Sequence, residues 1–506
     1  MSKVYLIGAG PGDPGLLTLR AKEILERADV VVYDYLANKA FLDFAKKGAE
    51  IIYVGKKGGD HTLPQGEINR LLVEKALSGK TVARLKGGDP YVFGRGAEEA
   101  EELLDAGADF EVVPGVTSAV AGPAYAGIPV THRSFASSVS FITGHEDPAK
   151  TESAHNWKAL AEGTSTLIFF MGVKNLPEIA ENLMKHGRPA STPAALVRWG
   201  TTCRHRSMVS TLGEIADEAR RQGFKAPSLI IVGDVVTLRD RLNFFEKRPL
   251  LGKGVAVTRS REQASGLVAR LTELGACCLE FPTIEIAPLA DYAPVDAAIG
   301  RLGGYDWVVF TSVNGVKYFF ERLDCLGLDA RAFAGKRVAA IGPATAQALA
   351  GRGIKADFVP EKYVAESVVE GLLERGAAGA RVLIPRARQA REVLPEQLAE
   401  AGAAVEVLPV YETVLADQDP EEVLGMLEMG ELHYLTFTSS STVDNFFAKV
   451  PAEKLAPYKD RLKIACIGPI TAKTLESYGF APSVMPEAFT IPALTGAIVA
   501  DAKGGD

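Results

Sequence analysis

Short apolar runs alternate with amphipathic stretches throughout the first half of the chain. Residues 4–8 form an apolar run that ends in glycine, and residues 16–26 follow it with a helical pattern. Further apolar runs recur at 30–33, 81–85, 110–113, 139–143, 166–171, 194–197 and 228–232. Short apolar strands between helices are typical of α/β domains with largely parallel sheets. Ligands of such sheets bind beyond the carboxyl ends of the strands.

The second half of the chain repeats itself at a fixed offset. Phe310-Thr311-Ser312 recurs 127 residues later as Phe437-Thr438-Ser439, and other blocks recur at nearly the same offset. We interpret this pattern as a tandem duplication, with copies at about 253–379 and 380–506. It predicts a bilobed α/β unit with parallel sheets and a cleft for a small ligand. Because a repeat need not coincide with a compact lobe, the first strands of copy one can pack with the end of copy two.

A charged stretch separates the two halves. The regular pattern loosens at 239–253, which contains Pro249 and Gly252. We therefore place one domain at 1–245, a linker at 246–252 and a second domain at 253–506.

The composition excludes several classes of protein. The 506 residues carry a formal net charge of −7, which argues against a general nucleic-acid-binding protein. No apolar run approaches the roughly 18 residues that span a bilayer, and the strand pattern at 4–8 leaves no room for a signal peptide. We expect a cytoplasmic protein that binds neither nucleic acid nor membranes.

The cysteines point to no metal or redox site. They are Cys203, Cys277, Cys278, Cys325 and Cys466, which form no C-x-x-C pair and no Cys/His cluster with metal-ligand spacing. Because disulfides are rare in the cytosol, we expect free buried thiols.

Three glycine-containing turns, each between a strand and a helix, form the candidate site. The first, at 8–15, departs from the dinucleotide fingerprint G-x-G-x-x-G, because Asp13 stands where a glycine is expected and would face a pyrophosphate poorly. The others lie in the motifs 84–96 and 113–119. Glycine lets the backbone approach a ligand, and turns that follow strands of one sheet line one face of it. An NAD-dependent oxidoreductase and a turn without a ligand are the alternatives.

These motifs resemble those of uroporphyrinogen-III C-methyltransferases. Matching segments such as 8–14, 85–90, 127–129 and 143–145 span residues 1–245. The resemblance implies a two-lobed tetrapyrrole-methylase-type α/β fold that forms a homodimer. It also implies that S-adenosylmethionine methylates uroporphyrinogen III to precorrin-1 and precorrin-2, leaving S-adenosylhomocysteine. By the same resemblance the donor is held by Pro11, Gly87, Gly88, Asp89, Val92, Thr117, Ser118, Met171 and Gly200.

The resemblance further implies that Asp34 is a proton acceptor and Lys56 a proton donor. Asp34 ends the apolar strand 30–33, where burial and nearby charge can tune a carboxylate. Asp34 could instead bind the cofactor ribose, and Lys56 could clamp a substrate carboxylate. One departure from the family is His205, which stands where glutamine is usual and leaves a substrate contact there in doubt.

The duplicated half resembles uroporphyrinogen-III synthases, through segments such as 310–315, 410–413 and 467–472. The resemblance implies closure of linear hydroxymethylbilane to uroporphyrinogen III, with inversion of the last pyrrole and without cofactor or metal. Tyr411 matches the tyrosine proposed to help the hydroxyl group leave, and its counterpart in copy one is Ile284. A core tyrosine is the alternative. Candidate ligands for the substrate carboxylates are Arg259, Ser439 and Thr471.

Together the two halves predict a bifunctional enzyme of tetrapyrrole biosynthesis. We expect both the methyltransferase half and the ring-closing synthase half to act on small tetrapyrroles. We expect the chain to form a homodimer through its methyltransferase half. A methyltransferase that carries a non-catalytic, tetrapyrrole-sensing bilobed module is the main alternative.

Overall fold

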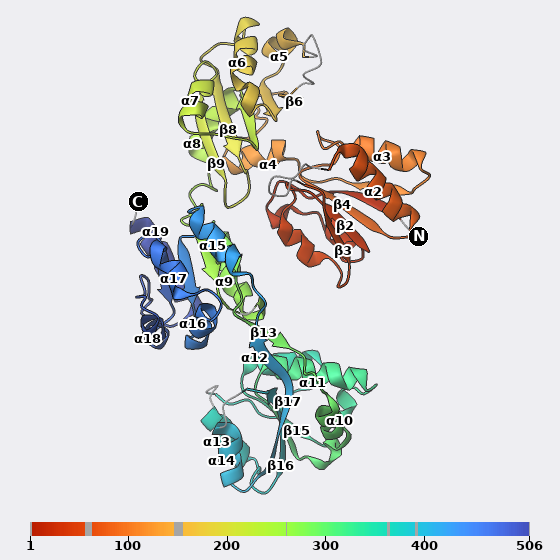
Figure 1. Ribbon diagram of the computed structural model, residues 1–506, viewed down its shortest axis with the longest axis vertical. Coiled ribbons are helices and arrows are strands. Elements are labelled where there is room, and N and C mark those ends of the chain that lie inside the picture. Colours follow the sequence, from red (N-terminus) through yellow and green to blue (C-terminus); the bar gives the residue numbers. More distant parts are fainter. Residues whose placement is uncertain are drawn as a thin grey trace. The chain divides into compact units, whose positions relative to one another are not determined.

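The computed structural model describes residues 3–55, 63–145, 155–259, 261–361, 365–389 and 393–504, which contain four β-sheets with helices packed around them (Figure 1). The chain divides into two compact units. The first consists of Met1–Gly254, Ala269–Cys278 and Val499–Asp506, and the second of Val255–Val268 and Leu279–Ile498. No helix in the described part of the chain is both long and apolar enough to cross a membrane.

The first sheet is parallel throughout and has the strand order β3-β2-β4-β1-β5. Alternate residues of a strand face opposite sides of its sheet. Ile7 on β1 packs with α1 (Leu19–Leu25), whereas its neighbour Leu6 packs with α2 (Gln65–Leu77) and α3 (Gly96–Asp105) on the other side. Helices therefore cover both faces and leave the carboxyl edge of the sheet for the turns. The strands are β1 (Val4–Gly8), β2 (Val30–Tyr33), β3 (Glu50–Tyr53), β4 (Val82–Lys86) and β5 (Phe110–Val113).

The second sheet, of order β6-β7-β10-β8-β9, is mixed. β6 and β7 run parallel, whereas β10 is antiparallel to β7 and β8, and β8 is antiparallel to β9. Residues 199–205 join β8 to β9 and are too few for the crossover that a parallel pair needs. The strands are β6 (Val139–Thr143), β7 (Thr166–Phe170), β8 (Pro193–Arg198), β9 (Arg206–Thr211) and β10 (Ser228–Val232). The helices of this part are α4 (Ser118–Tyr125), α5 (Trp157–Gly163), α6 (Leu176–Lys185), α7 (Ile215–Arg221) and α8 (Arg239–Leu242).

Strands from both sequence copies share the third sheet, of order β12-β11-β18-β19. β11 (Gly254–Val257) and β12 (Cys277–Glu280) belong to copy one, and β18 (Tyr434–Phe437) and β19 (Lys463–Cys466) belong to copy two. The sequence analysis allowed the first strands of copy one to pack with the end of copy two, and this packing is confirmed. The largest side chains of its core come mainly from copy two, and they include Phe437 and Phe446.

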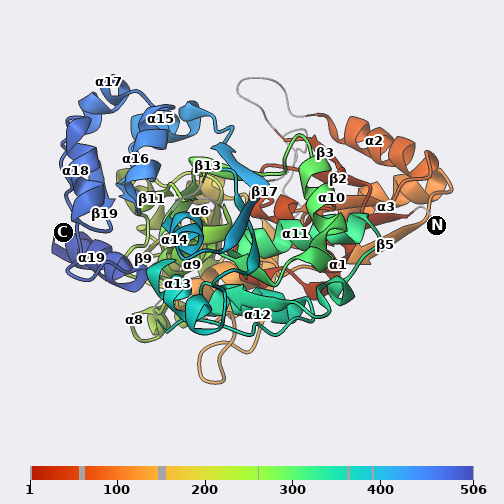
Figure 2. The same ribbon diagram turned by 90° about the horizontal axis from the view of Figure 1, so that it is seen from below.

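The fourth sheet has the order β13-β17-β16-β14-β15. Its long strand β17 pairs in parallel with β16 and antiparallel with β13, which lies beside it in both views (Figures 1 and 2). The strands are β13 (Ile284–Ala287), β14 (Trp307–Phe310), β15 (Arg337–Ala340), β16 (Arg381–Ala387) and β17 (Ala404–Leu415). The helices of the second half are α9 (Arg261–Glu273), α10 (Ala293–Gly300), α11 (Val313–Cys325), α12 (Pro343–Gly351), α13 (Ala365–Glu374), α14 (Val393–Glu400), α15 (Pro420–Glu428), α16 (Ser440–Phe447), α17 (Ala452–Leu455), α18 (Pro469–Ser477) and α19 (Ile491–Gly504).

The expectation of free buried thiols is wrong for most of the cysteines. Cys203 and Cys277 form a disulfide, with their Cα atoms 5.2 Å apart and a sequence separation of 74. Of the remaining three, Cys466 is buried, Cys278 is partly buried and Cys325 is exposed. Gly252 N donates to the Cys203 carbonyl oxygen at 3.1 Å, and Cys277 N donates to the Lys253 carbonyl oxygen at 2.9 Å, so residues 252 and 253 are bonded to both cysteines. Spacing rules for cysteines do not detect a pair so distant in sequence.

His205 is buried and belongs to a partly buried polar group at the β8–β9 turn. Its Nε2 lies 2.8 Å from Glu246 Oε1, and Glu246 also accepts hydrogen bonds from Ser207, Arg239 and Asn243. Burial raises the pKa of Glu246, but the hydrogen bonds from His205, Ser207 and Asn243 and the charge of Arg239 lower it more, to about 2. His205, the residue that departs from the family pattern, therefore has a hydrogen-bond partner in Glu246.

The cysteine pairing predicts the number of reactive thiols. Titration of denatured, unreduced protein with a thiol reagent should find three thiols per chain, and five after reduction. Cys203→Ser combined with Cys277→Ser should leave three thiols under both conditions. Five thiols in the unreduced protein would contradict the pairing.

The Glu246 group predicts an acid-sensitive contribution to stability. Because the folded pKa of about 2 lies below the ordinary value of 4.5, the contribution is complete above pH 4.5 and is lost as the pH falls towards 2. We expect the melting temperature to fall further between pH 5 and pH 3 for the wild type than for Glu246→Gln. Over this pH range the wild type should lose about 2 kcal/mol more unfolding free energy than Glu246→Gln does. Glu181→Gln, at an exposed position, should follow the wild type, and parallel curves for all three proteins would contradict the contribution.

Candidate functional site

The three glycine-containing turns lie side by side at the carboxyl edge of the first sheet. They follow β4, β1 and β5, which are neighbours in the strand order. Gly10 and Gly88 exchange backbone hydrogen bonds of 3.1 and 2.7 Å. A Cβ atom built on Gly115 would lie 2.3 Å from the Gly88 carbonyl oxygen, a contact that no side chain tolerates. Gly88 also has a φ of +70°, which L residues rarely adopt. The sequence-based placement of these turns on one edge is confirmed.

Asp89 ties two of these turns together. Its Oδ1 accepts a hydrogen bond from Tyr91 N at 2.8 Å, and its Oδ2 accepts one from Gly115 N at 3.0 Å. The carboxylate therefore fixes the distance between the turns after β4 and β5. Each oxygen keeps a lone pair for a ligand.

The second sheet brings two more segments towards these turns. Thr201 Oγ1 accepts a hydrogen bond from Asp13 N at 3.2 Å, which places the loop containing Gly200 against the first turn. The Phe93 and Phe170 rings are 5.0 Å apart, which places Met171 near the turn after β4. Met171 has a φ of +54°, a strained conformation of the kind found at ligand sites.

The residues that the resemblance assigns to the methyl donor are all at least partly exposed. They lie after β1, β4, β7 and β8 and at the start of α4, and they are Pro11, Gly87, Gly88, Asp89, Val92, Thr117, Ser118, Met171 and Gly200. Thr117 caps α4 by accepting a hydrogen bond from Ala119 N. These residues therefore belong to the turns themselves or to segments that follow strands of the second sheet.

Asp13 makes the first turn unsuited to a pyrophosphate. Its Oδ1 accepts a hydrogen bond from Gly15 N at 2.8 Å, and its Oδ2 accepts one from the Tyr125 hydroxyl at 2.7 Å. Burial and the bond to Asp13 raise the pKa of Tyr125 to about 12, so the phenol remains a donor at neutral pH. The turn thus presents a carboxylate where dinucleotide sites present free N–H groups.

Asp34 lies at the same edge, directly after β2. Its Oδ2 accepts a hydrogen bond from Arg84 Nη2 at 3.1 Å, and its Oδ1 accepts one from Leu36 N at 3.1 Å. Its side chain is 27% exposed. Lys56, the predicted proton donor, lies outside the described residues.

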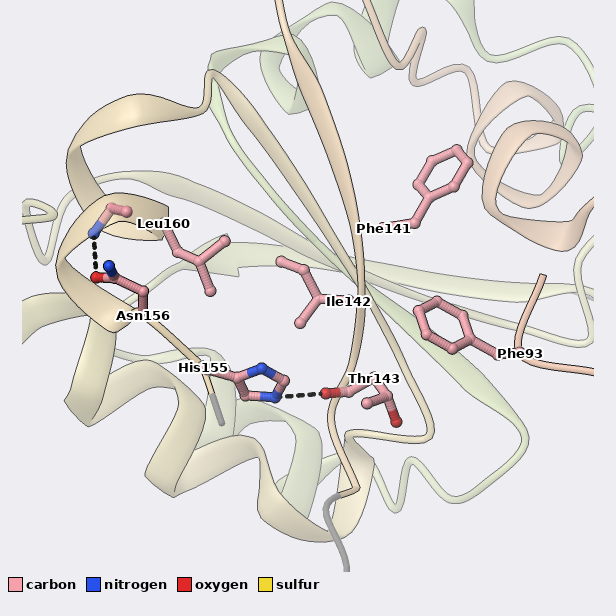
Figure 3. Close-up of a pocket in the computed structure, with 8 residues that line it drawn as sticks. Phe93, Phe141, Ile142, Thr143, His155, Asn156 and Leu160 are labelled. Carbon is pink, nitrogen blue, oxygen red and sulfur yellow. Dashed lines mark hydrogen bonds between the residues drawn. The ribbon is translucent and has the colours of Figure 1, made fainter. Parts of the chain in front are cut away.

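A hollow of about 330 Å³ opens at the carboxyl end of β6 (Figure 3). Phe93, Phe141 and Ile142 give it apolar walls, and His155 Nε2 donates a hydrogen bond to the Thr143 carbonyl oxygen at 2.9 Å. None of the predicted site residues in the described part of the chain lines it. Sequence reasoning missed it because its walls come from three separate segments.

Tyr411 lies on β17 and is 7% exposed. Its hydroxyl is 3.1 Å from Ser312 Oγ, and its ring stacks on Tyr318 with centroids 5.5 Å apart. Ser312 caps α11 and accepts a hydrogen bond from Gly315 N at 2.9 Å. Sequence reasoning did not single out Ser312, although its 127-residue offset from Ser439 could have shown it.

Arg259, Ser439 and Thr471 follow neighbouring strands of the third sheet, β11, β18 and β19. Ser439 caps α16, and Thr471 lies buried in the first turn of α18. Burial lowers the pKa of Arg259. The structure therefore gathers these three at one edge, while Tyr411 belongs to the fourth sheet.

Two family models match the chain. The model for Tetrapyrrole (Corrin/Porphyrin) Methylases matches residues 3–216, and the model for Uroporphyrinogen-III synthase HemD matches residues 265–496. The chain is 40% identical to a porphyrin biosynthesis protein HemD of Ruminiclostridium josui, over 94% of this chain and 93% of that protein.

Two of the similar relatives are uroporphyrinogen-III methyltransferases. A uroporphyrinogen-III C-methyltransferase of Bacillus subtilis is 44% identical, over 67% of this chain and 69% of that protein. An S-adenosyl-L-methionine-dependent uroporphyrinogen III methyltransferase of Methanosarcina barkeri is 57% identical, over 47% of this chain and 94% of that protein. The chain therefore belongs to the HemD family of porphyrin biosynthesis proteins, and it joins a uroporphyrinogen-III C-methyltransferase domain to a uroporphyrinogen-III synthase domain.

Proposed function

We propose that this chain closes hydroxymethylbilane to uroporphyrinogen III in its second half and methylates that product to precorrin-1 and precorrin-2 in its first half. The proposed methylation rests mainly on the close contact of three turns at one sheet edge. There, a Cβ atom on Gly115 would overlap the carbonyl oxygen of Gly88. Such turns let a ligand reach the backbone. The acidic Asp13 and Asp89 suit a donor that carries a positive charge.

S-adenosylmethionine, when bound, supplies an already activated methyl group on a sulfonium. The donor-binding role falls to Pro11, Gly87, Gly88, Asp89, Val92, Thr117, Ser118, Met171 and Gly200. These residues contribute by holding the methyl group in line with a pyrrole carbon, because alignment is the largest demand of this displacement. One proton must leave the methylated carbon afterwards.

Asp34 is proposed as the acceptor of that proton, with Lys56 as the donor. Asp34 is partly exposed at the same edge as the turns, within reach of a ligand held there. Its alternative role is to bind the ribose of the donor. The two roles differ in their effect, since a ribose contact affects donor affinity and a base affects turnover.

In the second half, we assign Tyr411 to assist departure of the hydroxyl group of hydroxymethylbilane. The phenol donates its proton to the hydroxyl oxygen of the substrate. The C–O bond then breaks, its electron pair goes to that oxygen, and water departs. Ser312, 3.1 Å away, can donate a hydrogen bond to the phenolate that remains. Arg259, Ser439 and Thr471 bind substrate carboxylates from the other sheet.

Ring closure needs no cofactor in this proposal, because loss of the hydroxyl group generates the electrophile from the substrate itself. The first half is proposed to form a homodimer, and the chain to act in the cytoplasm on small tetrapyrroles.

The glycine contact predicts the effect of one added methyl group on donor-site affinity. Gly115→Ala must push the turns after β4 and β5 apart, so we expect S-adenosylhomocysteine to bind about tenfold more weakly or worse, by calorimetry. In the matched control Gly66→Ala, no described atom lies within 4 Å of the new Cβ, and wild-type affinity should remain. Unchanged affinity in Gly115→Ala, or binding of NAD by the wild type instead, would contradict the donor site.

Mass spectrometry of the products from hydroxymethylbilane and S-adenosylmethionine tests both activities together. The wild type should yield precorrin-2. Asp34→Asn should accumulate unmethylated uroporphyrinogen III, with methylation reduced about a hundredfold or more. Tyr411→Phe should slow formation of the type III ring and still methylate added uroporphyrinogen III.

Each half can fail separately in this assay. A wild type that methylates added uroporphyrinogen III but gives only the type I ring from hydroxymethylbilane would show that the second half is a sensor rather than a synthase. An Asp34→Asn protein with lowered S-adenosylhomocysteine affinity and normal turnover at saturation would make Asp34 a ribose ligand.

A further inference from the structure

Four charged side chains form a continuous network under the carboxyl edge of the first sheet. This buried charge cluster consists of Arg84, Lys86, Glu99 and Asp34. Arg84 Nη2 donates to Asp34 Oδ2 at 3.1 Å, and Arg84 Nε donates to Glu99 Oε1 at 3.3 Å. Lys86 Nζ donates to the same glutamate oxygen at 2.6 Å. Three of the side chains are at most 5% exposed, whereas Asp34 is 27% exposed. Ligands therefore reach the cluster at Asp34.

Stability alone does not account for these charges. A buried ion pair is often no more stable than apolar residues of similar size, and Ala83 and Leu85, which alternate with the two cations on β4, are fully buried and apolar. Burial and the charge of Arg84 lower the pKa of Lys86, while Glu99 opposes them. Removal of either carboxylate would leave excess positive charge among buried groups.

Glu99 is fixed from more than one element. It lies in the first turn of α3, and Gln65 at the start of α2 donates to its Oε1 at 3.1 Å. Arg84 is thus held through Glu99 by both helices that cover this face, and Arg84 Nη1 also donates to the Leu85 carbonyl oxygen at 3.1 Å. The guanidinium makes all these bonds at once, and in this orientation its Nη2 donates to Asp34.

We propose that Arg84, anchored by Glu99, is a positioning residue that holds Asp34 as an oriented carboxylate for methyl transfer. This inference rests on the proposed methyltransferase function. The bonds from Arg84 and Leu36 each occupy one lone pair of an Asp34 oxygen, so each oxygen keeps another for the ligand.

The test uses a charge-balanced pair of substitutions in the full-length protein. Arg84→Gln with Glu99→Gln removes one charge of each sign and leaves Lys86 with Asp34, so that no excess buried charge is created. A matched control is Arg20→Gln with Glu111→Gln, a more exposed pair whose side chains lie 3.1 Å apart, with Arg20 on α1 and Glu111 on β5 of the same sheet. Methylation of added uroporphyrinogen III is followed for each variant, together with its melting temperature and S-adenosylhomocysteine affinity.

We expect the cluster variant to melt close to the wild type and to lose about tenfold to a hundredfold in kcat. Its KM for the methyl donor should stay near the wild-type value. Adding Asp34→Asn to the cluster variant should reduce kcat no further than Asp34→Asn alone does, because Arg84 acts through Asp34. The control pair should keep its kcat.

Three outcomes would overturn the positioning role. They are an unchanged kcat in the cluster variant, losses that multiply when Asp34→Asn is added, and a fall in activity that follows melting temperature across the variants. If the cluster variant does not fold, the single substitution Arg84→Lys replaces it, with the same predicted loss in kcat and the same combination with Asp34→Asn. A wild type that does not methylate uroporphyrinogen III would instead refute the proposed function.

Discussion

The close approach of three backbone turns is the constraint on which the first half of this protein depends. Gly115 lies so near Gly8 and Gly88 that a Cβ atom would come within 2.3 to 2.7 Å of their backbone atoms. Neighbouring parallel strands place the turns at one edge, and glycine lets them touch. The carboxylate of Asp89 then fixes their spacing through the N–H groups of Tyr91 and Gly115. Alignment of a methyl donor requires a site with this rigidity.

The two sequence copies of the second half have similar strand-to-helix turns, but the residues around these turns differ between the copies. Ser312 and Ser439 are equivalent in the two copies, and both cap helices at the ends of parallel strands. Ser312 lies 3.1 Å from the Tyr411 hydroxyl, whereas Ser439 bonds to Thr442 in its own helix. The position equivalent to Tyr411 in copy one is Ile284. At this position of the repeat, a side chain that can donate a proton therefore occurs in copy two and not in copy one.

Local pattern predicted most of the strands of the first half, whereas the repeat predicted the lobes of the second half without bounds for their strands. Interactions between distant residues account for the other features that the sequence analysis missed. The runs at 110–113, 139–143 and 228–232 are strands with those bounds, because short apolar runs between helices have few other ways to be buried. The strands β3 and β9 escaped notice, and both have exposed residues that interrupt the apolar pattern. The disulfide of Cys203 with Cys277 joins segments 74 residues apart, and no local motif marks it. The buried charge cluster was missed for the same reason, since Arg84, Glu99 and Asp34 are distant in sequence and their types alone suggest solvent-exposed residues.

The central claim is that the three turns form the binding site for the methyl donor. A crystal structure of the full chain with S-adenosylhomocysteine tests it most directly. The account predicts that the ligand lies across the turns after β1, β4 and β5, with backbone atoms of Gly87 and Gly88 against it and Asp34 facing the substrate side. Ligand bound elsewhere, with these turns in contact only with one another, would contradict it.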